Sequence, residues 1–372
     1  MVDRYHSANI TYDVLDCPVR EENCLRLDVR FHQLSLIVDF GLALLFILGF
    51  GNGANDVGKS VAALLTDPET ASFRPRRAPL IWGGLFSGLG SIAAVLISVR
   101  LFSAFTPQSF FQSAPGSSFI VAALVGAAAW IIIATLVRIQ VSTTHALVGA
   151  IIIQAVYLLG ASSLQWDFLI WRILLPLAAG PFAALFGVYV LSRLTHKKQV
   201  EAEQSTPEQA STAPLPSKHA HFADWGAAAG VSFARGINDA PKIAAMGAFL
   251  LLGSAGDSVW LPFMIVGAAV VVGSLIWGDR VAKTLIGKTP FHRGHRLKAH
   301  AATALLVSAG AYFGAAFSTT HVSDGAVAGH HKKGRQFLGP ALRNMASAWL
   351  VTLPMAGLLA IVASMIGAGF WG

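Results

Sequence analysis

Long apolar stretches alternate with short polar segments along the whole chain. The apolar stretches cover residues 34–65, 79–101, 117–138, 145–160, 168–192, 223–253, 258–278, 299–317 and 341–368. Several of them reach the roughly 20 residues that a helix needs to cross a bilayer. Their hydrophobicity is continuous rather than alternating, which is typical of membrane helices and unlike the strands of a β-barrel. The pattern predicts an all-α polytopic membrane protein with about ten transmembrane or re-entrant helical segments.

The composition agrees with this class and excludes a soluble protein. The 372 residues are 54% hydrophobic and 12% charged, and the mean hydropathy is +0.60. Soluble domains carry about 25% charged residues. The formal net charge of +8 suggests nucleic acid or anionic lipid as a partner. However, the Lys and Arg residues lie in short loops between apolar stretches, where they report membrane topology. We therefore expect a lipid bilayer and no nucleic acid as partner.

Polar segments divide the chain into four parts. Residues 1–33 form a polar tail, 34–194 a first membrane half, 195–222 a linker rich in Pro, Ser, Thr and Ala, and 223–372 a second membrane half. The composition of the linker is typical of disorder. The tail shows no cleavable signal peptide. Its two cysteines, Cys17 and Cys24, either form one local disulfide, if the tail is exported, or stay unpaired.

The two membrane halves repeat three motifs in the same order. The aligned pairs are GANDVGKSVAALL (53–65) with GINDAPKIAAMGA (236–248), Gly90-Ser91 with Gly273-Ser274, and STTHALVGA (142–150) with STTHVSDGA (318–326). The first pair aligns Asn55 with Asn238, Asp56 with Asp239, and Lys59 with Lys242. Three matches at similar spacings indicate an internal duplication.

The charges of the loops predict how each half crosses the membrane. Lys and Arg gather in loops 66–78, 279–298 and 330–343 and at the start of 193–222, whereas loops 102–116, 161–167 and 254–257 carry none. The basic loops are expected inside. The linker is then cytoplasmic, both termini are extracytoplasmic, and the two copies of each motif run in opposite directions. The pattern predicts two inverted-topology repeats with broken helices, an architecture of secondary transporters whose site lies at the repeat interface.

The Asn-Asp motifs interrupt apolar stretches that are longer than one straight crossing needs. Glycine beside Asn-Asp favours unwinding or a turn. Polar, irregular backbone at membrane depth is tolerated where it lines a cavity or is buried in protein. A single copy would fit an ordinary loop with an Asn or Asp helix cap. Two inverted copies, each with an Asp and a Lys, favour a functional site.

Each Ser-Thr-Thr-His motif is predicted to begin a helix. Its hydroxyls and the free N–H groups of the first turn make a ready anion site, which the helix dipole favours. Two such helix starts from opposite sides of the membrane are suited to a tetrahedral oxyanion. The histidines, His145 and His321, are either proton relays or packed structural residues. Among the other charges near the motifs, Arg235 and Asp324 are expected to support the site rather than line it.

These motifs carry a family resemblance. GANDVGKS, GINDAPK, VSTTHALVGA and FSTTHVSDGA resemble the signature motifs of the inorganic phosphate transporter (PiT) family, including its sulfate permease relatives, over most of residues 35–365. The resemblance implies that Asp56, Asp239, Asn55 and Asn238 bind the coupling cation and contact phosphate. It also implies an anion-binding set of hydroxyls, formed by Ser142, Thr143, Thr144, Ser318, Thr319 and Thr320.

The chain departs from the family pattern at one position in each Asn-Asp motif. Lys59 and Lys242 stand where the family usually has a second asparagine. An amide oxygen can coordinate Na⁺, whereas an ammonium cannot and brings its own charge. Each lysine is therefore expected to act as a tethered cation that pairs with the nearby aspartate or faces the anion, which favours H⁺ over Na⁺ coupling. Alternatively, both lysines reach away from the site and Na⁺ binds the remaining oxygens.

The function expected from the sequence is transport of inorganic phosphate with H⁺ or Na⁺ by alternating access. Sulfate is the alternative substrate, and a passive anion channel is the alternative mechanism. Phosphate at neutral pH keeps a proton that it can donate to a carboxylate, which favours it over sulfate. An intramembrane enzyme is not expected, because a nucleophile and its base do not require two antiparallel copies. No cofactor and no metal beyond Na⁺ are expected, and the protein is a candidate homodimer.

Overall fold

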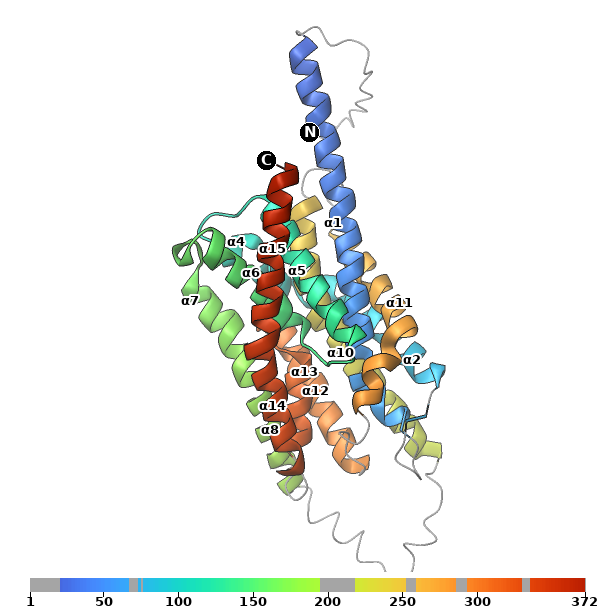
Figure 1. Ribbon diagram of the computed structural model, residues 1–372. Helices are drawn as coiled ribbons and strands as arrows, with labels where there is room; N and C mark the ends of the chain where they lie inside the picture. Colours follow the sequence, from blue (N-terminus) through green and yellow to red (C-terminus); the bar gives the residue numbers. More distant parts are fainter. Residues whose placement is uncertain are drawn as a thin grey trace, which may run out of the picture.

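The structure is a bundle of long helices that lie side by side (Figure 1). It is a computed structural model, and it describes residues 21–66, 73–74, 76–194, 218–251, 259–285, 293–329 and 335–371. No strand occurs among them. Cys17, most of the linker (195–217) and the basic residues 330–334 lie outside these ranges, so the disulfide and the linker stay predictions. The mostly helical architecture expected from the apolar pattern is confirmed.

The first half of the chain supplies four long helices and several short ones. In chain order they are α1 (Glu21–Val61), α2 (Arg77–Ile97), α3 (Val99–Ala104), α4 (Pro107–Phe110), α5 (Ser117–Leu136), α6 (Thr143–Leu158), α7 (Trp166–Phe168) and α8 (Leu175–Leu194). A π-helical turn at Leu169–Leu174 joins α7 to α8. The helix α1 begins inside the polar tail, at Glu21.

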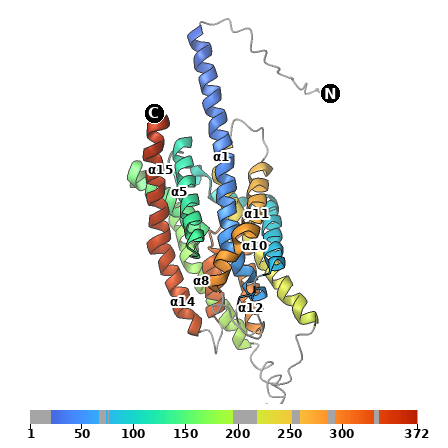
Figure 2. The same ribbon diagram turned by 45° about the vertical axis from the view of Figure 1, so that its right-hand side comes forward.

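The second half repeats much of this order. It consists of α10 (Lys218–Leu251), α11 (Trp260–Leu285), α12 (Arg293–Phe313), α13 (Thr319–Ala328), α14 (Arg335–Ser347) and α15 (Leu353–Trp371). A π-helical turn at Ala348–Thr352 joins α14 to α15. In Figures 1 and 2, α1 descends through the bundle from its projecting end, whereas α10 rises from the opposite end.

Six helical segments in the described part of the chain are long and apolar enough to cross a membrane. They are Asp39–Leu64, Arg77–Ile97, Ser117–Leu136, Trp166–Leu194, Trp260–Leu285 and Leu338–Gly367. The helix α6 is apolar but shorter. Helix α10 is also long, but it carries Arg235, Asp239 and Lys242 in its middle. The segments confirm an integral membrane protein, since apolar helices of this length match the thickness of a bilayer.

The predicted unwinding at the Asn-Asp motifs is wrong. Helix α1 continues through Asn55 and Asp56, and α10 continues through the second motif. The glycines there allow close packing instead of a turn. A Cβ added at Gly53 would lie 2.1 Å from the carbonyl oxygen of Val270 on α11, and one at Gly236 would lie 2.2 Å from that of Ser87 on α2. Small residues let membrane helices approach backbone to backbone.

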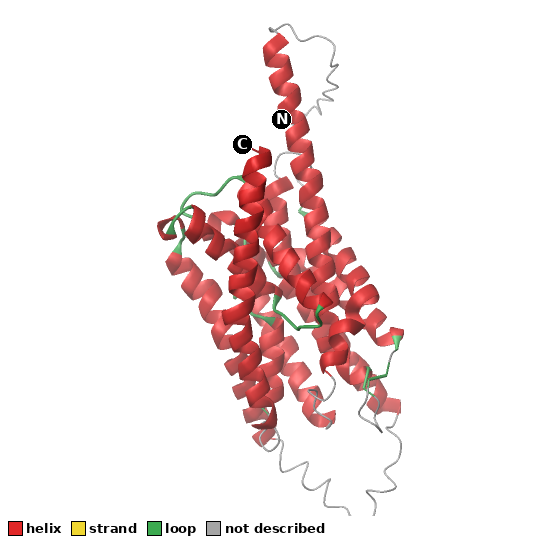
Figure 3. Ribbon diagram, viewed as in Figure 1, coloured by secondary structure: helices red, strands yellow, loops and turns green. Residues whose placement is uncertain are grey.

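The helices break at the Ser-Thr-Thr-His motifs instead. Helix α5 ends at Leu136 and α6 begins at Thr143, while α12 ends at Phe313 and α13 begins at Thr319. Each connector contains one residue in the left-handed region, Arg138 with φ 61° and Gly314 with φ 79°. Figure 3 shows loop segments in the middle of the bundle as well as at its ends. Interior loops of this kind need polar partners, since lipid offers none.

Candidate functional site

The polar residues predicted from the motifs come together inside the bundle. Eleven of them are at most 4% exposed: Asn55, Asp56, Asn238, Asp239, Lys242, Ser142, Thr143, Thr144, Ser318, Thr319 and Thr320. The side chain of Lys59 is 3% exposed. Polar groups buried this deeply must find partners within the protein.

Asp56 is held between two cations. The ammonium of Lys59, one turn further along α1, pairs with one of its carboxylate oxygens. The guanidinium of Arg235 on α10 lies 3.1 Å from the other oxygen through Nη2. The Nη1 group of Arg235 also donates to the backbone carbonyl of Asp56. Both oxygens of this carboxylate are therefore engaged by positive groups from the two halves of the chain.

Asp239 has a different set of partners. Lys242 approaches it to 3.4 Å, and the neighbouring amide of Asn238 donates to it at 2.8 Å. From the first half of the chain, the amide of Asn52 on α1 donates to Asp239 at 3.3 Å. From the second half, the hydroxyl of Thr319 donates to it at 3.4 Å. One cation and several neutral donors thus surround Asp239, whereas two cations hold Asp56.

Each lysine also reaches a threonine of the opposite half. Lys59 donates to the hydroxyl of Thr320 at the start of α13, and Lys242 donates to that of Thr144 at the start of α6, over 2.8 Å. Lys242 donates in addition to the carbonyl of Phe317, at 2.8 Å. The alternative expectation, that the lysines reach away from the site, is therefore wrong. Their ammonium groups lie at the centre of the polar cluster.

The first turns of α6 and α13 face each other. Ser142 caps α6 and Ser318 caps α13, as predicted for these motifs. The hydroxyl of Ser318 donates to that of Ser142 over 2.9 Å, which joins the two helix starts. Thr143 accepts a hydrogen bond from Asn52, at 2.9 Å. Two helix N-termini that meet in this way direct their N–H groups and positive dipole ends into one region.

Two histidines lie directly behind the serine caps. The rings of His145 and His321 pack edge to face, with centroids 4.6 Å apart, and Trp349 packs against His145. The Nδ1 atom of His145 lies 2.9 Å from the hydroxyl of Ser142. The packing against Trp349 and the helix cap fits the structural reading of these histidines.

The two asparagines of the motifs hold the connectors in place. The amide of Asn55 donates to Thr135 at 3.0 Å and to the carbonyl of Ile139 at 2.9 Å. Its oxygen accepts from the backbone N–H of Val141, at 3.0 Å. Asn238 donates to the carbonyl of Phe317, at 3.1 Å. Asn55 and Asn238 therefore position the residues that precede α6 and α13, where the structure has no regular helix.

The sequence matches a known protein family over most of its length. The model of the phosphate transporter family matches residues 52–360, which include both Asn-Asp motifs and both Ser-Thr-Thr-His motifs. The chain belongs to this family. The resemblance seen in the motifs is thereby confirmed, and the protein is a membrane transporter of the phosphate transporter family.

Relatives in this family match about nine tenths of this chain. The probable low-affinity inorganic phosphate transporter of Bacillus subtilis (strain 168) is 29% identical over 358 residues, which cover 91% of this chain and 98% of that one. The protein of the same description from Mycobacterium tuberculosis (strain ATCC 25618 / H37Rv) is 28% identical over 346 residues, covering 90% and 77%. A solved structure titled the sodium-dependent phosphate transporter matches with a TM-score of 0.73 and 20% identity, covering 90% of this chain and 99% of that chain. That likeness shows the fold.

Two residues of the buried polar cluster were not among the predicted ligands. Arg235 was expected only to support the site, and it contacts Asp56 directly. Asn52 was missed, although it contacts Thr143 and Asp239. The signal was present in the alignment, because Asn52 stands opposite Arg235 three residues before each Asn-Asp pair. Asp324, which was also expected to support the site, accepts a hydrogen bond from Asn344 at 2.9 Å.

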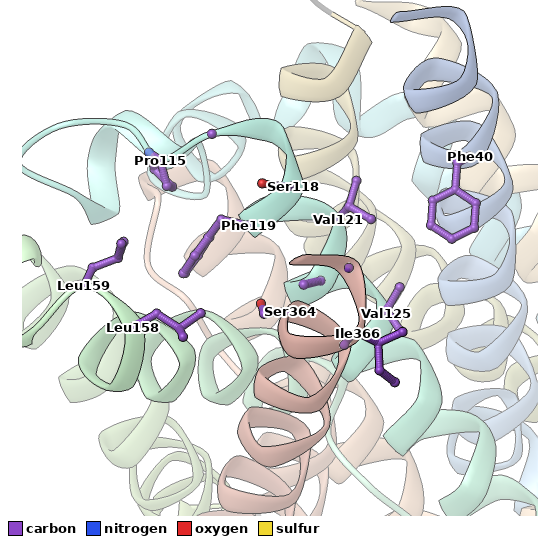
Figure 4. Close-up of a pocket in the computed structure, with 14 residues that line it drawn as sticks. Phe40, Pro115, Ser118, Phe119, Val121, Val125, Leu158, Leu159, Ser364 and Ile366 are labelled. Carbon is purple, nitrogen blue, oxygen red and sulfur yellow. The ribbon is translucent and has the colours of Figure 1, made fainter. Parts of the chain in front are cut away.

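A separate cavity of about 750 Å³ lies away from this polar cluster. Figure 4 shows it between α1, α5, α6 and α15, with Phe40, Phe119, Leu158 and Ile366 around it. None of the described residues that line it is charged. An apolar cavity of this kind offers nothing that would hold an oxyanion. Within the described ranges no group of three or more His, Cys, Asp or Glu is placed to bind a metal ion.

Proposed function

We propose that this member of the phosphate transporter family carries inorganic phosphate across the membrane, coupled to a cation, by alternating access. The observation that carries the proposal is the charge of the buried polar cluster. Three cations, Lys59, Arg235 and Lys242, share the cluster with two carboxylates, Asp56 and Asp239. The side chains in mutual contact are therefore left with one surplus positive charge.

A surplus charge in the interior of a membrane protein is expensive unless an opposite charge joins it. An anion bound beside the cluster would balance it. The facing starts of α6 and α13 add N–H donors, hydroxyls and two positive dipole ends. A tetrahedral oxyanion suits this arrangement, because its four oxygens can accept hydrogen bonds from both helix starts at once.

Phosphate suits the cluster better than sulfate does. Asp56 and Asp239 are hydrogen-bond acceptors that both lie within reach of the amide of Asn52. Phosphate at neutral pH keeps a proton that it can donate to either carboxylate, whereas sulfate has none to donate. The curated relatives of this chain are named as inorganic phosphate transporters. Sulfate remains the competitor against which the substrate must be tested.

The two halves of the chain are proposed to form inverted repeats, residues 34–194 and 223–372. Matching contacts between the aligned motifs support this. Lys59 bonds to the third motif residue of the other half, Thr320, and Lys242 bonds to its counterpart, Thr144. The opposite directions of α1 and α10 in Figures 1 and 2 agree with inversion. Exchange of conformation between two such halves would open the site to each side in turn.

The positions of the lysines support coupling to H⁺ rather than Na⁺. Each ammonium lies against an aspartate and a threonine hydroxyl, which are oxygens that a Na⁺ ion would need. A tethered cation there repels a second one. The sodium-dependent transporter with the similar fold shares only 20% sequence identity, so its coupling ion need not be that of this chain. The central linker is proposed to be cytoplasmic and both termini extracytoplasmic, from the loop charges.

Uptake of radiolabelled phosphate into proteoliposomes tests the proposal. We expect saturable uptake driven by an inward pH gradient, no stimulation by a Na⁺ gradient, and little competition from sulfate. Trans-stimulation by internal phosphate is expected of a carrier and not of a channel. Asp56→Asn and Asp239→Asn should each lower uptake, because each leaves a buried lysine without its carboxylate; removing one partner of such a pair typically disturbs the site by about 2–5 kcal/mol.

Three results would contradict parts of the proposal. Wild-type liposomes that take up sulfate but not phosphate would reassign the substrate. Uptake that requires Na⁺ and ignores pH would reject H⁺ coupling while leaving phosphate transport intact. Full uptake by both aspartate variants would reject the site. The exposed Asp279, which pairs with Lys283 at the surface, serves as the matched control when it is changed to Asn.

A further inference from the structure

The aligned motifs place different side chains at one pair of positions in the site. Asn52 on α1 and Arg235 on α10 each stand three residues before the Asn-Asp pair of their motif. The backbone around Asn52 and the backbone around Arg235 make corresponding contacts in the two halves. Phe50, two residues before Asn52, contacts Gly273, and Phe233, two residues before Arg235, contacts Gly90. The helices thus offer two similar positions, of which one holds a neutral amide and the other a cation.

Both side chains point to the same carboxylate oxygen. Arg235 approaches Oδ2 of Asp56 to 3.1 Å, and the amide of Asn52 lies 3.5 Å from that atom. Arg235 is 2% exposed. Its Nη groups are engaged with Asp56, but its Nε has no hydrogen-bond partner among the described residues. A buried N–H without an acceptor is costly unless a bound group supplies one.

Arg235 adds the third cation to the cluster, because it is a second positive partner of Asp56. Lys59 and Lys242 balance Asp56 and Asp239 one to one, so without Arg235 the contacting side chains would be neutral. A neutral cavity gains little from admitting an anion, because the anion must leave its water shell. An arginine keeps its charge under all conditions that a protein meets. The positive charge of Arg235 is therefore permanent.

We propose that Arg235 is a specificity-determining residue of the oxyanion site, and that its fixed charge draws phosphate to a cluster whose other contacting charges balance. The inference rests on the proposed phosphate transport and names the residue that selects for an anion. Asn52 marks the corresponding position of the other half. A cation placed there serves the same purpose, because it lies against the same carboxylate. If Arg235 only linked α10 to the carbonyl of Asp56, a cation at position 52 would not restore phosphate binding.

The test exchanges the two side chains in the full-length protein reconstituted in liposomes. Four variants are compared with wild type: Arg235→Asn, Arg235→Lys, Asn52→Arg, and the exchange Asn52→Arg with Arg235→Asn. Initial rates of labelled phosphate uptake give KM and Vmax for each, and sulfate is added as competitor. Size-exclusion profiles and apparent Tm values in detergent show whether each variant is folded.

Arg235→Asn should raise the KM for phosphate about tenfold, which corresponds to about 1.4 kcal/mol of binding, with a smaller change in Vmax. Arg235→Lys keeps the charge but cannot make both guanidinium contacts with Asp56, so its KM should lie between those of wild type and Arg235→Asn. The exchange variant restores one surplus charge beside Oδ2 of Asp56, so its KM should return to within about threefold of wild type. Asn52→Arg alone adds a second surplus charge and should strengthen competition by sulfate, which is always a dianion.

Two of the variants give results that would overturn the inference. A folded Arg235→Asn protein with the wild-type KM would show that the charge does not act on the substrate. An exchange variant that is folded and as weak as Arg235→Asn would show that Arg235 acts through its place in α10 and not through its charge. Failure of the proposed function is separate, because in that case wild type itself shows no saturable uptake of phosphate.

Discussion

The substitution Gly53→Ala examines whether the site depends on direct contact between α1 and α11. A Cβ at this position would lie 2.1 Å from the carbonyl oxygen of Val270 and 2.8 Å from its carbonyl carbon. Ordinary contact requires at least 3.4 Å. The two backbones must therefore separate by roughly 1 Å, because neither atom belongs to a side chain that can rotate away.

This displacement has a cost in stability and in transport. Forcing an extra methyl into a packed helix contact typically costs about 1–3 kcal/mol, which corresponds to roughly 5 °C in apparent Tm. Asp56 lies one turn from Gly53 on the same helix, and its 3.1 Å contact with Arg235 crosses to α10. A shift of about 1 Å in a binding constellation lowers rates by up to about 100-fold. We expect a tenfold or greater loss of phosphate uptake.

A matched control isolates the cause. Gly187 lies in the interior of α8, and a Cβ there would meet no heavy atom within 4 Å. Gly187→Ala should therefore keep the Tm and the uptake rate of wild type. Both variants are compared by thermal unfolding in detergent and by uptake in liposomes. If Gly53→Ala behaved like Gly187→Ala in both assays, the contact between α1 and α11 would not be as tight as described, and the packing argument would fail.

Two further perturbations address the coupling ion and the helix starts. The double substitution Lys59→Asn and Lys242→Asn replaces both ammonium groups by amide oxygens that can coordinate Na⁺. We expect uptake to become stimulated by a Na⁺ gradient, and a variant still indifferent to Na⁺ would refute the assignment of the lysines to cation positions. Ser142→Ala with Ser318→Ala removes two caps of about 1 kcal/mol each and the hydroxyl contact between them. It should lower the apparent Tm and raise the KM for phosphate, whereas the exposed Ser162→Ala should change neither.

The alignment of the motifs predicted which residues gather in the buried polar cluster, but it did not predict their backbone conformation. The expected break at Asn55-Asp56 did not occur. Gly53 lies in regular helix and allows close contact with a distant carbonyl, where a turn was expected. That carbonyl belongs to Val270, more than 200 residues away in sequence, and no local propensity reports it. The break at Ser142 was predictable, since a serine cap and a helix start are local features.

The contacts of Arg235 and Asn52 also depend on the tertiary structure. The alignment places them at matching positions, which was the signal for Asn52, but the contacts that each side chain makes are not visible in the sequence. Contact with the same oxygen of Asp56 depends on how α1 and α10 pack. Whether a buried lysine faces the site or the membrane surface is decided in the same way, because its long side chain can reach either.

The sequence by itself determined the class of this protein, the internal repeat, the family and the residue types gathered in the motifs. These follow from hydrophobic runs, spacing and side-chain chemistry, which are properties of the chain alone. The tertiary structure decided where the helices break, which carboxylate has two cations, and that Lys59 and Lys242 cross to Thr320 and Thr144. Those outcomes depend on contacts between segments far apart in the chain, where packing and the need to satisfy buried charge select among local choices.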